Sequence, residues 1–535
     1  MHAMMFSVRQ LLRVAAVAAT SLCLQAVDAA VPGITGPSFN LVAAAGRISQ
    51  PDGASVYAWG YGCNGAPTSF APTAVQGANC PSGAMQLPGP TLIVNQGDTV
   101  TVTLTNNLPA AAGNTSILFP GFQVTATNGA PGVLTREAPH GYSVTYSFVA
   151  STPGTHSYYS GTRGDLQIEM GLYGALIVLP KLNGGIPTGY TTPAGLPVTC
   201  RAVSATSPSG QTDFRLAAAA YDNPAACYDR EYLFQFSEMD PRIHVQADQQ
   251  SNLSCASPTG CMTIAIEPYK AAYFMINGRS MPDDMDSHYA VQYPNQPYNG
   301  NPHMHPGEIT LLRIIGQGRM QHPFHEHGNH VRLLARDGNL LLSQTQGSNS
   351  LAGPLLFTTT TTPGITLDGV YQWTAKGLNW DVYGHVKGGT PGVDTEPCYP
   401  DANGYYTTAS NPPAPPTAHN YYEWCLDHEK PLEAHAFGDV GSGGPVTLPD
   451  PNVLQNGAWY SGSPYLGPDA TQRAVGNTPL PPTGTIANSP KSEAGFAFMW
   501  HSHNEREITT DNIFPGGMLM MMLVDPWVYV IDESN

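Results

Sequence analysis

The stretch "PTLIVNQGDTVTVTLTNN", from Pro90 to Asn107, decides the class of fold. From Thr99 onward, threonine alternates with valine or leucine, so every second side chain is apolar. Successive side chains of a β-strand point to opposite faces of its sheet, and a period of two therefore predicts a strand with one buried face. The Gly97-Asp98 pair is typical of a turn that leads into such a strand.

Similar signals on both sides of this stretch predict an all-β chain. "GLYGALIVLP" (Gly171–Pro180) is a short apolar strand that closes a first unit over residues 35–180. Residues 181–229 are rich in proline, glycine and threonine, which predicts a linker. Residues 230–527 hold further strand-like stretches, with an insertion of little periodicity at about 390–490. Many short strands and few helix signals predict two β-sandwich domains, and a third domain stays an alternative if the insertion folds separately.

The composition suits short strands and disfavours several classes of partner. The 535 residues are 41% hydrophobic, which is ample for two or three packed domains. Only 11% of the residues are charged, while 56 glycines and 49 prolines favour turns. The formal net charge of −17 makes nucleic acid and anionic membranes unfavourable partners, because both repel an acidic surface.

Residues 1–29 have the pattern of a secretory signal peptide. Arg9 and Arg13 supply a positive start, and residues 14–24 form an apolar core that is too short to span a bilayer. We therefore predict that the mature chain is exported, either to a periplasm or out of the cell. No later run is long and apolar enough to predict a membrane-spanning helix.

Cysteine usage agrees with export. Of the nine cysteines, Cys23 belongs to the predicted signal peptide. The other eight form pairs of sequence neighbours: Cys63 and Cys80, Cys200 and Cys227, Cys255 and Cys261, and Cys398 and Cys425. Local disulfides within these pairs are the simplest prediction, although spacing alone leaves the connectivity open.

Histidines gather in two short segments. "QHPFHEHGNH" (Gln321–His330) holds four of them, and "HSH" ends an apolar run near the C-terminus. On extended strands His325 and His327 share one face, and so do His501 and His503. Neutral imidazole is a common ligand of copper and zinc, so two converging pairs predict a transition-metal site. The alternative is a cluster of hydrogen-bonded core histidines.

Other soft or basic ligands are weaker candidates. His303, His305 and His330 are more naturally loop residues than ligands. The methionine-rich segment offers thioethers that suit Cu(I): Met518, Met520, Met521 and Met522. Alternation on a strand predicts that Met518, Met520 and Met522 point together into the core.

Taken together, these segments resemble the multicopper oxidases, which are built from cupredoxin domains. The resemblance rests on the Pro90–Asn107 stretch, "GLYGALIV", "HPFHEHG" and "HSHNEREITTDNIFPGGM" (His501–Met518), which follow one another in the family's order. It implies two Greek-key cupredoxin sandwiches and copper as cofactor. Members of the family accept electrons at a blue type 1 copper and pass them to a trinuclear cluster that reduces oxygen to water.

Within the second half, the resemblance assigns five candidate metal ligands. In the H-P-x-H-x-H motif, His322 matches a type 1 ligand, His325 a type 2 ligand and His327 a type 3 ligand. In the last motif His501 and His503 match type 3 ligands.

Two positions of that last motif depart from the family. Ser502 replaces the type 1 cysteine, and Glu507 replaces a histidine. Glu507 is then either a partner that fixes an imidazole tautomer or a hard ligand beside His322.

In the first half, the family's histidine motifs would fall on Leu118, Pro120, Tyr159 and Gly161, so all four ligands are absent. Blue-copper behaviour needs a thiolate, and a serine hydroxyl is a weak substitute. We therefore expect an incomplete set with fewer than the family's four copper ions.

These observations favour an exported, multicopper-oxidase-like, copper-binding oxidoreductase. Its partners would be a metal ion, a small reduced donor and oxygen. The family's two-domain chains often form trimers, which makes a homotrimer an expectation. Two alternatives stay open: a non-catalytic copper-binding protein in metal handling, and a degenerate scaffold that binds a partner.

Overall fold

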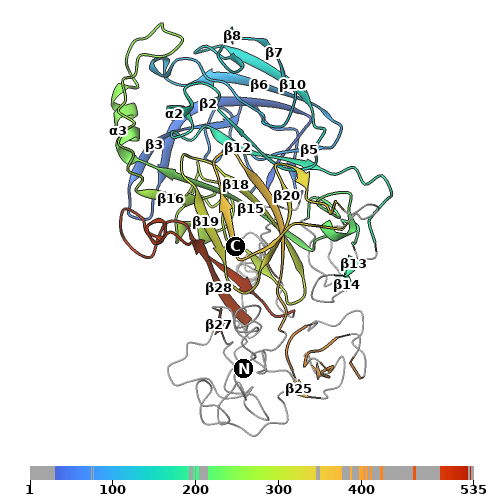
Figure 1. Cartoon of the computed structure of the whole chain (residues 1–535). Coiled ribbons are helices and arrows are strands. Elements are labelled where there is room, and N and C mark those ends of the chain that lie inside the picture. Colours follow the sequence, from blue (N-terminus) through green and yellow to red (C-terminus); the bar gives the residue numbers. More distant parts are fainter. Residues whose placement is uncertain are drawn as a thin grey trace, which may run out of the picture.

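A computed structural model of the chain describes residues 31–375, with gaps at 74, 76, 189, 192–196, 199, 204–214 and 345–349. It also describes 386–387, 397–402, 404–407, 410–411, 422–425, 462–465, 495–527 and 531. Four main β-sheets make up this part of the chain, and helices are few and short (Figure 1). The predicted all-β fold is thereby confirmed. The predicted signal peptide and most of the predicted insertion lie outside the described residues.

The first two sheets contain five strands each and come from the N-terminal part. One has the order β11-β12-β5-β1-β4, and the other β3-β2-β6-β10-β7. Their bounds are β1 Gly33–Thr35, β2 Ser38–Ser49, β3 Ser55–Cys63, β4 Phe70–Ala71, β5 Leu92–Asn95, β6 Thr99–Asn107, β7 Thr125–Asn128, β10 Ser143–Val149, β11 Gly154–Tyr159 and β12 Tyr173–Leu179.

The stretch from Pro90 to Asn107 forms β5, a turn and β6, as its pattern predicts. Along β6, Val100, Val102 and Leu104 are fully buried, whereas the threonines between them are partly exposed. Strand β6 pairs with β10 in an antiparallel register and with β2 in a parallel register. A central strand of this kind places its valines and leucine between the two sheets.

The other two main sheets come from the C-terminal part. The seven-stranded sheet has the order β16-β15-β18-β24-β20-β21, with β22 also on β20, and the six-stranded sheet has the order β17-β29-β28-β19-β23, with β27 also on β28. Their bounds are β15 Arg230–Met239, β16 Tyr273–Ile276, β17 His303–Met304, β18 Ile309–Gly316, β19 His322–Glu326, β20 Val331–Arg336, β21 Asn339–Leu340, β22 Leu355–Leu356, β23 Thr358–Thr361, β24 Thr366–Gln372, β27 Gly462–Tyr465, β28 Gly495–Ser502 and β29 Leu519–Val524.

Smaller elements connect these sheets. Three two-stranded pairs are β8 Ala130–Pro131 with β9 Arg136–Glu137, β13 Tyr190–Thr191 with β14 Pro197–Val198, and β25 Val386–Lys387 with β26 Pro397–Cys398. The helical turns are η1 Ala110–Ala112, α2 Gly164–Gln167, η2 Pro224–Ala226, η3 Asp283–Met285 and η5 Glu505–Ile508. The ten-residue helix α3 (Pro241–Gln250) begins at Asp240, whose carboxylate accepts from the Arg242 N–H as an N-cap.

A buried ionic network joins the two pairs of sheets. Arg313 on β18 donates to Glu231 on β15 (2.8 Å) and to the hydroxyl of Thr155 on β11 (3.1 Å). The Asp368 carboxylate on β24 accepts from the Thr155 N–H and from the Tyr221 hydroxyl. Since these partners neutralise and hydrogen-bond the buried charges, the network fixes β11 against the second pair of sheets.

The strands of the first pair of sheets lie within 33–179 and those of the second within 230–524. The domain boundaries at 35–180, 181–229 and 230–527 are compatible with this division and stay a proposal. Disulfides Cys63–Cys80, Cys200–Cys227 and Cys255–Cys261 confirm three of the predicted local pairs, and Cys425 is also disulfide-bonded. Among the described residues, no helix has the length and apolarity needed to cross a membrane.

Candidate metal centre

Strands β19 and β28 carry the two histidine segments and pair directly. Their antiparallel register places His325 opposite His501, and Phe324 opposite Ser502. Phe324 and Trp500 belong to the core between the two C-terminal sheets. Because strand side chains alternate, His325 and His501 lie on the outer face of the six-stranded sheet.

Three imidazoles converge on that face. His325, His327 and His501 each offer one ring nitrogen, and these nitrogens all lie within 4.8 Å of one another. The ring centroid of His325 lies 4.9 Å from that of His327 and 5.6 Å from that of His501. The centroids of His327 and His501 are 5.2 Å apart. All three side chains are buried. We call these residues the histidine trio.

Two rings of the trio are oriented through Nδ1. The His501 Nδ1 lies 2.7 Å from the Ser502 carbonyl oxygen, and the His325 Nδ1 lies 2.8 Å from the Thr358 hydroxyl. A carbonyl oxygen only accepts, so the His501 Nδ1 carries the proton and its Nε2 keeps a lone pair. This arrangement is typical of histidines that bind a metal through Nε2.

Two rings of the trio, those of His325 and His501, are held in their neutral form. Burial, together with the nearby His503 and His501 rings, lowers the pKa of His325 to about 4. Burial also lowers the pKa of His501. Near neutral pH both rings are therefore unprotonated, which is the form that a metal requires.

His503 lies at the rim of the trio. Its ring centroid is 4.8 Å from that of His325 and 5.5 Å from that of His501, and its side chain is 55% exposed. Phe357, which is 49% exposed, has its ring 5.8 Å from that of His325. The trio thus lies just below a surface formed in part by an imidazole and an apolar ring.

His322 lies apart from the trio. It alternates with His325 along β19, so its ring points inward, where Nδ1 is 2.8 Å from Glu507 and Nε2 is 2.9 Å from Glu238. Burial would lower the pKa of His322, but the two carboxylates outweigh it and raise this pKa to about 9. The ring is therefore an imidazolium between two carboxylates, and both of its nitrogens are occupied.

The position that matches a type 1 site is consequently a buried hydrogen-bonded cluster. The Ser502 hydroxyl donates to Glu507 (2.5 Å), and the Asn504 amide donates to the other Glu507 oxygen (2.8 Å). Glu507 thus acts as a partner of an imidazole, which is one of the two roles predicted for it. With serine in place of a thiolate and His322 fully hydrogen-bonded, these residues do not fit a blue copper ion.

The positions where first-half ligands would lie form ordinary strand contacts. The Leu118 N–H donates to the Tyr159 carbonyl (2.8 Å), and these two residues form an isolated β-bridge. A side chain at Gly161 would meet Leu118. Within the described part of the chain, the trio is the one group of three potential ligands, and it includes no residue of the first pair of sheets.

Two features of the site are not evident from the sequence. Glu238 lies 84 residues before its partner His322, and nothing in "REYLFQFSEMD" marks it as the second carboxylate. The His327 carbonyl accepts from both the Trp500 indole (2.9 Å) and the Tyr371 hydroxyl (3.0 Å), which fixes the backbone beneath the trio. Both features are contacts between residues that lie far apart in the sequence, so no local sequence pattern reveals them.

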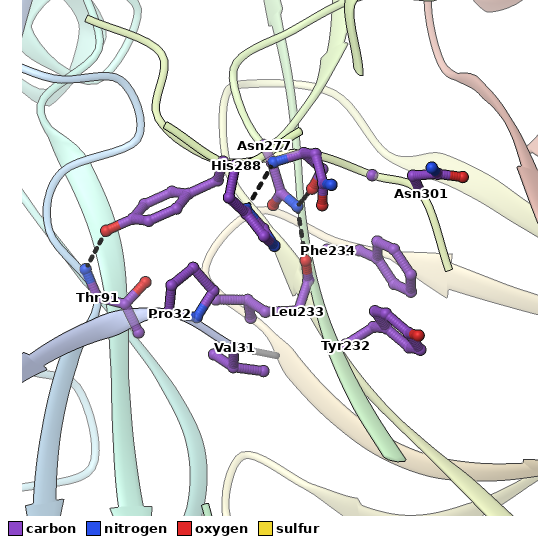
Figure 2. Close-up of a pocket in the computed structure, with 12 residues that line it drawn as sticks. Val31, Pro32, Thr91, Tyr232, Leu233, Phe234, Asn277, His288 and Asn301 are labelled. Atoms are coloured by element: carbon purple, nitrogen blue, oxygen red, sulfur yellow. Dashed lines mark hydrogen bonds between the residues drawn. The ribbon is translucent and has the colours of Figure 1, made fainter. Parts of the chain in front are cut away.

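A separate small pocket lies between the N-terminal segment and β15, away from the trio (Figure 2). The Tyr298 hydroxyl accepts from the Thr91 N–H. Figure 2 shows the Asn277 side chain donating to the Leu233 carbonyl. The residues that line it include no predicted metal ligand.

The fold and the trio define an all-β protein with a candidate histidine metal centre. The N-terminal part of the chain is similar to known proteins. Residues 71–183 match a family model described as multicopper oxidase. Multicopper oxidase MCE of Talaromyces pinophilus is 37% identical over 105 residues, covering 19% of this chain and 17% of that protein. Laccase abr2 of Aspergillus fumigatus is 39% identical over 105 residues, with the same two coverages.

The matches thus span about a sixth of the length of these relatives. A solved structure of the blue copper oxidase from Nitrosomonas europaea aligns over 91% of this chain and 85% of that one, with 15% identity and a TM-score of 0.42. Residues 71–183 are thus similar to a multicopper oxidase domain.

Proposed function

We propose that the chain is a copper-binding oxidoreductase of the multicopper oxidase type with an incomplete copper set. The convergence of His325, His327 and His501 within 4.8 Å carries this proposal. Three converging imidazoles suit copper in either oxidation state, and His503, whose side chain is 55% exposed, lies at their rim. Copper bound there would supply one-electron chemistry with oxygen as the acceptor.

This chain's own residues then perform three tasks. The trio binds the metal, while the Ser502 carbonyl and the Thr358 hydroxyl hold two of its rings. Burial keeps protons off His325 and His501, so metal and proton do not compete near neutral pH. Tyr371 and Trp500 hold the His327 backbone through its carbonyl.

Electrons would reach this centre without a type 1 copper. The cluster of Ser502, Glu507 and His322 lacks a thiolate and offers no electron entry of the family's kind. The rim, with the exposed His503 and the half-exposed Phe357, leaves the trio within reach of a small reduced donor. We therefore propose direct oxidation of a small donor at the trio.

Export and assembly belong to the same proposal. The three disulfides suit an oxidising compartment, in accord with export to a periplasm or out of the cell. A homotrimer is the assembly that we propose.

Elemental analysis of purified protein, reconstituted with Cu(II), tests the proposal. Wild type should bind fewer than four coppers per chain, and oxygen consumption with a phenolic donor should require them. The double variant His325→Ala/His501→Ala should lose both the copper of the trio and the turnover. His140→Ala, a matched change at a histidine bonded only to the Leu108 carbonyl, should keep both. Wild type that stays metal-free would overturn the proposal.

The ion-paired cluster at Ser502 favours one second candidate function. Without an electron entry of the family's kind, the chain could hold copper without turning over a donor. Stoichiometric copper with no oxygen consumption in the same assay would select this metal-handling function.

A further inference from the structure

The outer face of the six-stranded sheet carries a pair of methionines beside the trio. Strands β28 and β29 are antiparallel, and their register places Met499 opposite Met521. Met520, Met522 and Trp500 belong to the core. Alternation therefore sends Met499 and Met521 to the opposite face, where both are half-buried.

Of these two methionines, the sequence singled out Met521 but not Met499. Met518, Met520 and Met522 are buried in the core, where phenylalanine and tryptophan rings surround them. Met499 and Met521 instead share the outer face with His501, which is two residues from Met499 on the same strand. A third thioether lies close by, because the Met521 N–H donates to the Met285 sulfur (3.4 Å).

A histidine completes the group from the next strand. On β17, His303 lies opposite Leu523, and Met304 lies opposite Val524. Met304 and Val524 are core residues, so His303 and Leu523 face outward, on the same side as Met521. His303 is thus the diagonal neighbour of Met521 across two adjacent strands.

The His303 ring is arranged as a metal ligand would be. It is 7% exposed, and its Nδ1 lies 2.7 Å from the Asp525 carboxylate. Among the described residues, no atom hydrogen-bonds to its Nε2. A buried nitrogen without a partner is costly, and a carboxylate on the opposite nitrogen is the usual support of a metal-binding histidine.

We propose that Met499, Met521 and His303 form a second metal site, selective for Cu(I). Directly opposed strand residues have Cβ atoms about 4.5–5.5 Å apart and diagonal ones about 7–8 Å, and flexible thioethers can span such gaps. Two soft sulfurs and one imidazole favour Cu(I) over Cu(II), Mg²⁺ or Ca²⁺. The site goes beyond the proposed function, because it holds Cu(I) whether or not the trio supports turnover.

Its position gives the site a role as a copper reservoir for the trio. Met499 and His501 occupy the same face of β28 with one residue between them. Copper bound by Met499 would therefore lie beside the trio ligand His501 on the same face of β28.

The first test uses the full chain with the trio removed by His325→Ala/His501→Ala, so that only the second site remains. Selenomethionine is incorporated, and X-ray absorption is measured after anaerobic addition of one equivalent of Cu(I). We expect copper–selenium scattering, which disulfide sulfur cannot produce. Copper with nitrogen and oxygen neighbours only would overturn the proposal.

The second test measures Cu(I) affinity by competition with a chelator in the same background. Met499→Leu/Met521→Leu should weaken binding by at least about tenfold, as should His303→Ala. The matched control is Met520→Leu/Met522→Leu, which makes the same replacement on the core face and should leave the affinity unchanged. Leucine and methionine are close in volume, so the methionine variants should fold. Equal affinity in both methionine variants would overturn the proposal.

The two proposals fail separately. Wild type without turnover, together with intact copper–selenium scattering in the trio variant, would reject the proposed oxidase function and leave the second site standing. Turnover in wild type without any copper–selenium signal would support the trio and reject the second site.

Discussion

His325 and His501 lie directly opposite each other in an antiparallel strand pair, with ring centroids 5.6 Å apart. The side chains of such a pair share one face, and His327 joins them from just beyond the end of β19. Three residues from segments about 175 positions apart in the sequence, 325–327 and 501, thus meet through a single pairing register. A one-residue slip of β28 would turn His501 into the core and bring Ser502 to the outer face.

Copper binding by the trio should depend on pH in a specific window. Since the pKa of His325 is about 4 rather than about 6.5, protons should begin to displace copper only below about pH 5. A titration of bound Cu(II) by electron paramagnetic resonance from pH 8 to pH 3.5 would measure this. Half-release near pH 6.5 would show that the rings are not buried in their neutral form.

The copper-free protein should lose stability as the pH falls from about 6.5 to about 4. In the unfolded chain His325 takes up a proton near pH 6.5, whereas in the folded protein it does so only near pH 4. The unfolded state therefore binds more protons between these values, and the free energy of unfolding should fall as the pH falls through them. Urea titrations at pH 7, 5.5 and 4 would measure the effect, and His325→Ala should have a flatter profile.

His322 should give the opposite dependence on the alkaline side. Its pKa is raised from about 6.5 to about 9, so its contribution is fully present below pH 6.5 and is lost as the pH rises through 9. Glu238→Gln removes one of the two carboxylates that hold the proton, and should shift this loss to lower pH. An unchanged alkaline profile in that variant would contradict the imidazolium assignment.

Glu238→Gln should also be strongly destabilising near neutral pH. It uncouples a buried charged pair, which costs about 3–5 kcal/mol. The matched control is Glu267→Gln, whose carboxylate is 67% exposed and pairs with Arg319, and which should cost about 0–1 kcal/mol. Urea unfolding of both variants at pH 7 would compare the two free energies, and equal costs would mean that the His322 cluster is not a stabilising ion pair.

The contrast between His325 and His322 shows which parts of the fold and of the site could be predicted from the sequence. Period-two patterns around Val102 and the H-x-H spacing predicted strands and the facing of His325, because alternation is a local property. The same alternation separates His322 from His325, since an odd spacing of three places them on opposite faces. Family resemblance grouped both as ligands, whereas the partners Glu238 and Glu507 arrive through tertiary packing that no local pattern encodes.

Because it lacks a type 1 site, the copper-loaded protein should lack the intense blue colour of such sites. Intense blue colour needs charge transfer from a thiolate, so copper-loaded wild type should show only weak visible absorption. Ser502→Cys alone should change little, because Glu507 would still occupy the Nδ1 of His322. Ser502→Cys combined with Glu507→His removes that carboxylate and supplies both missing ligand types, so an intense blue band should appear only in the double variant. Visible and electron paramagnetic resonance spectra of the three proteins decide this, and a strong blue band in wild type would mean that Ser502 is not at the cysteine position.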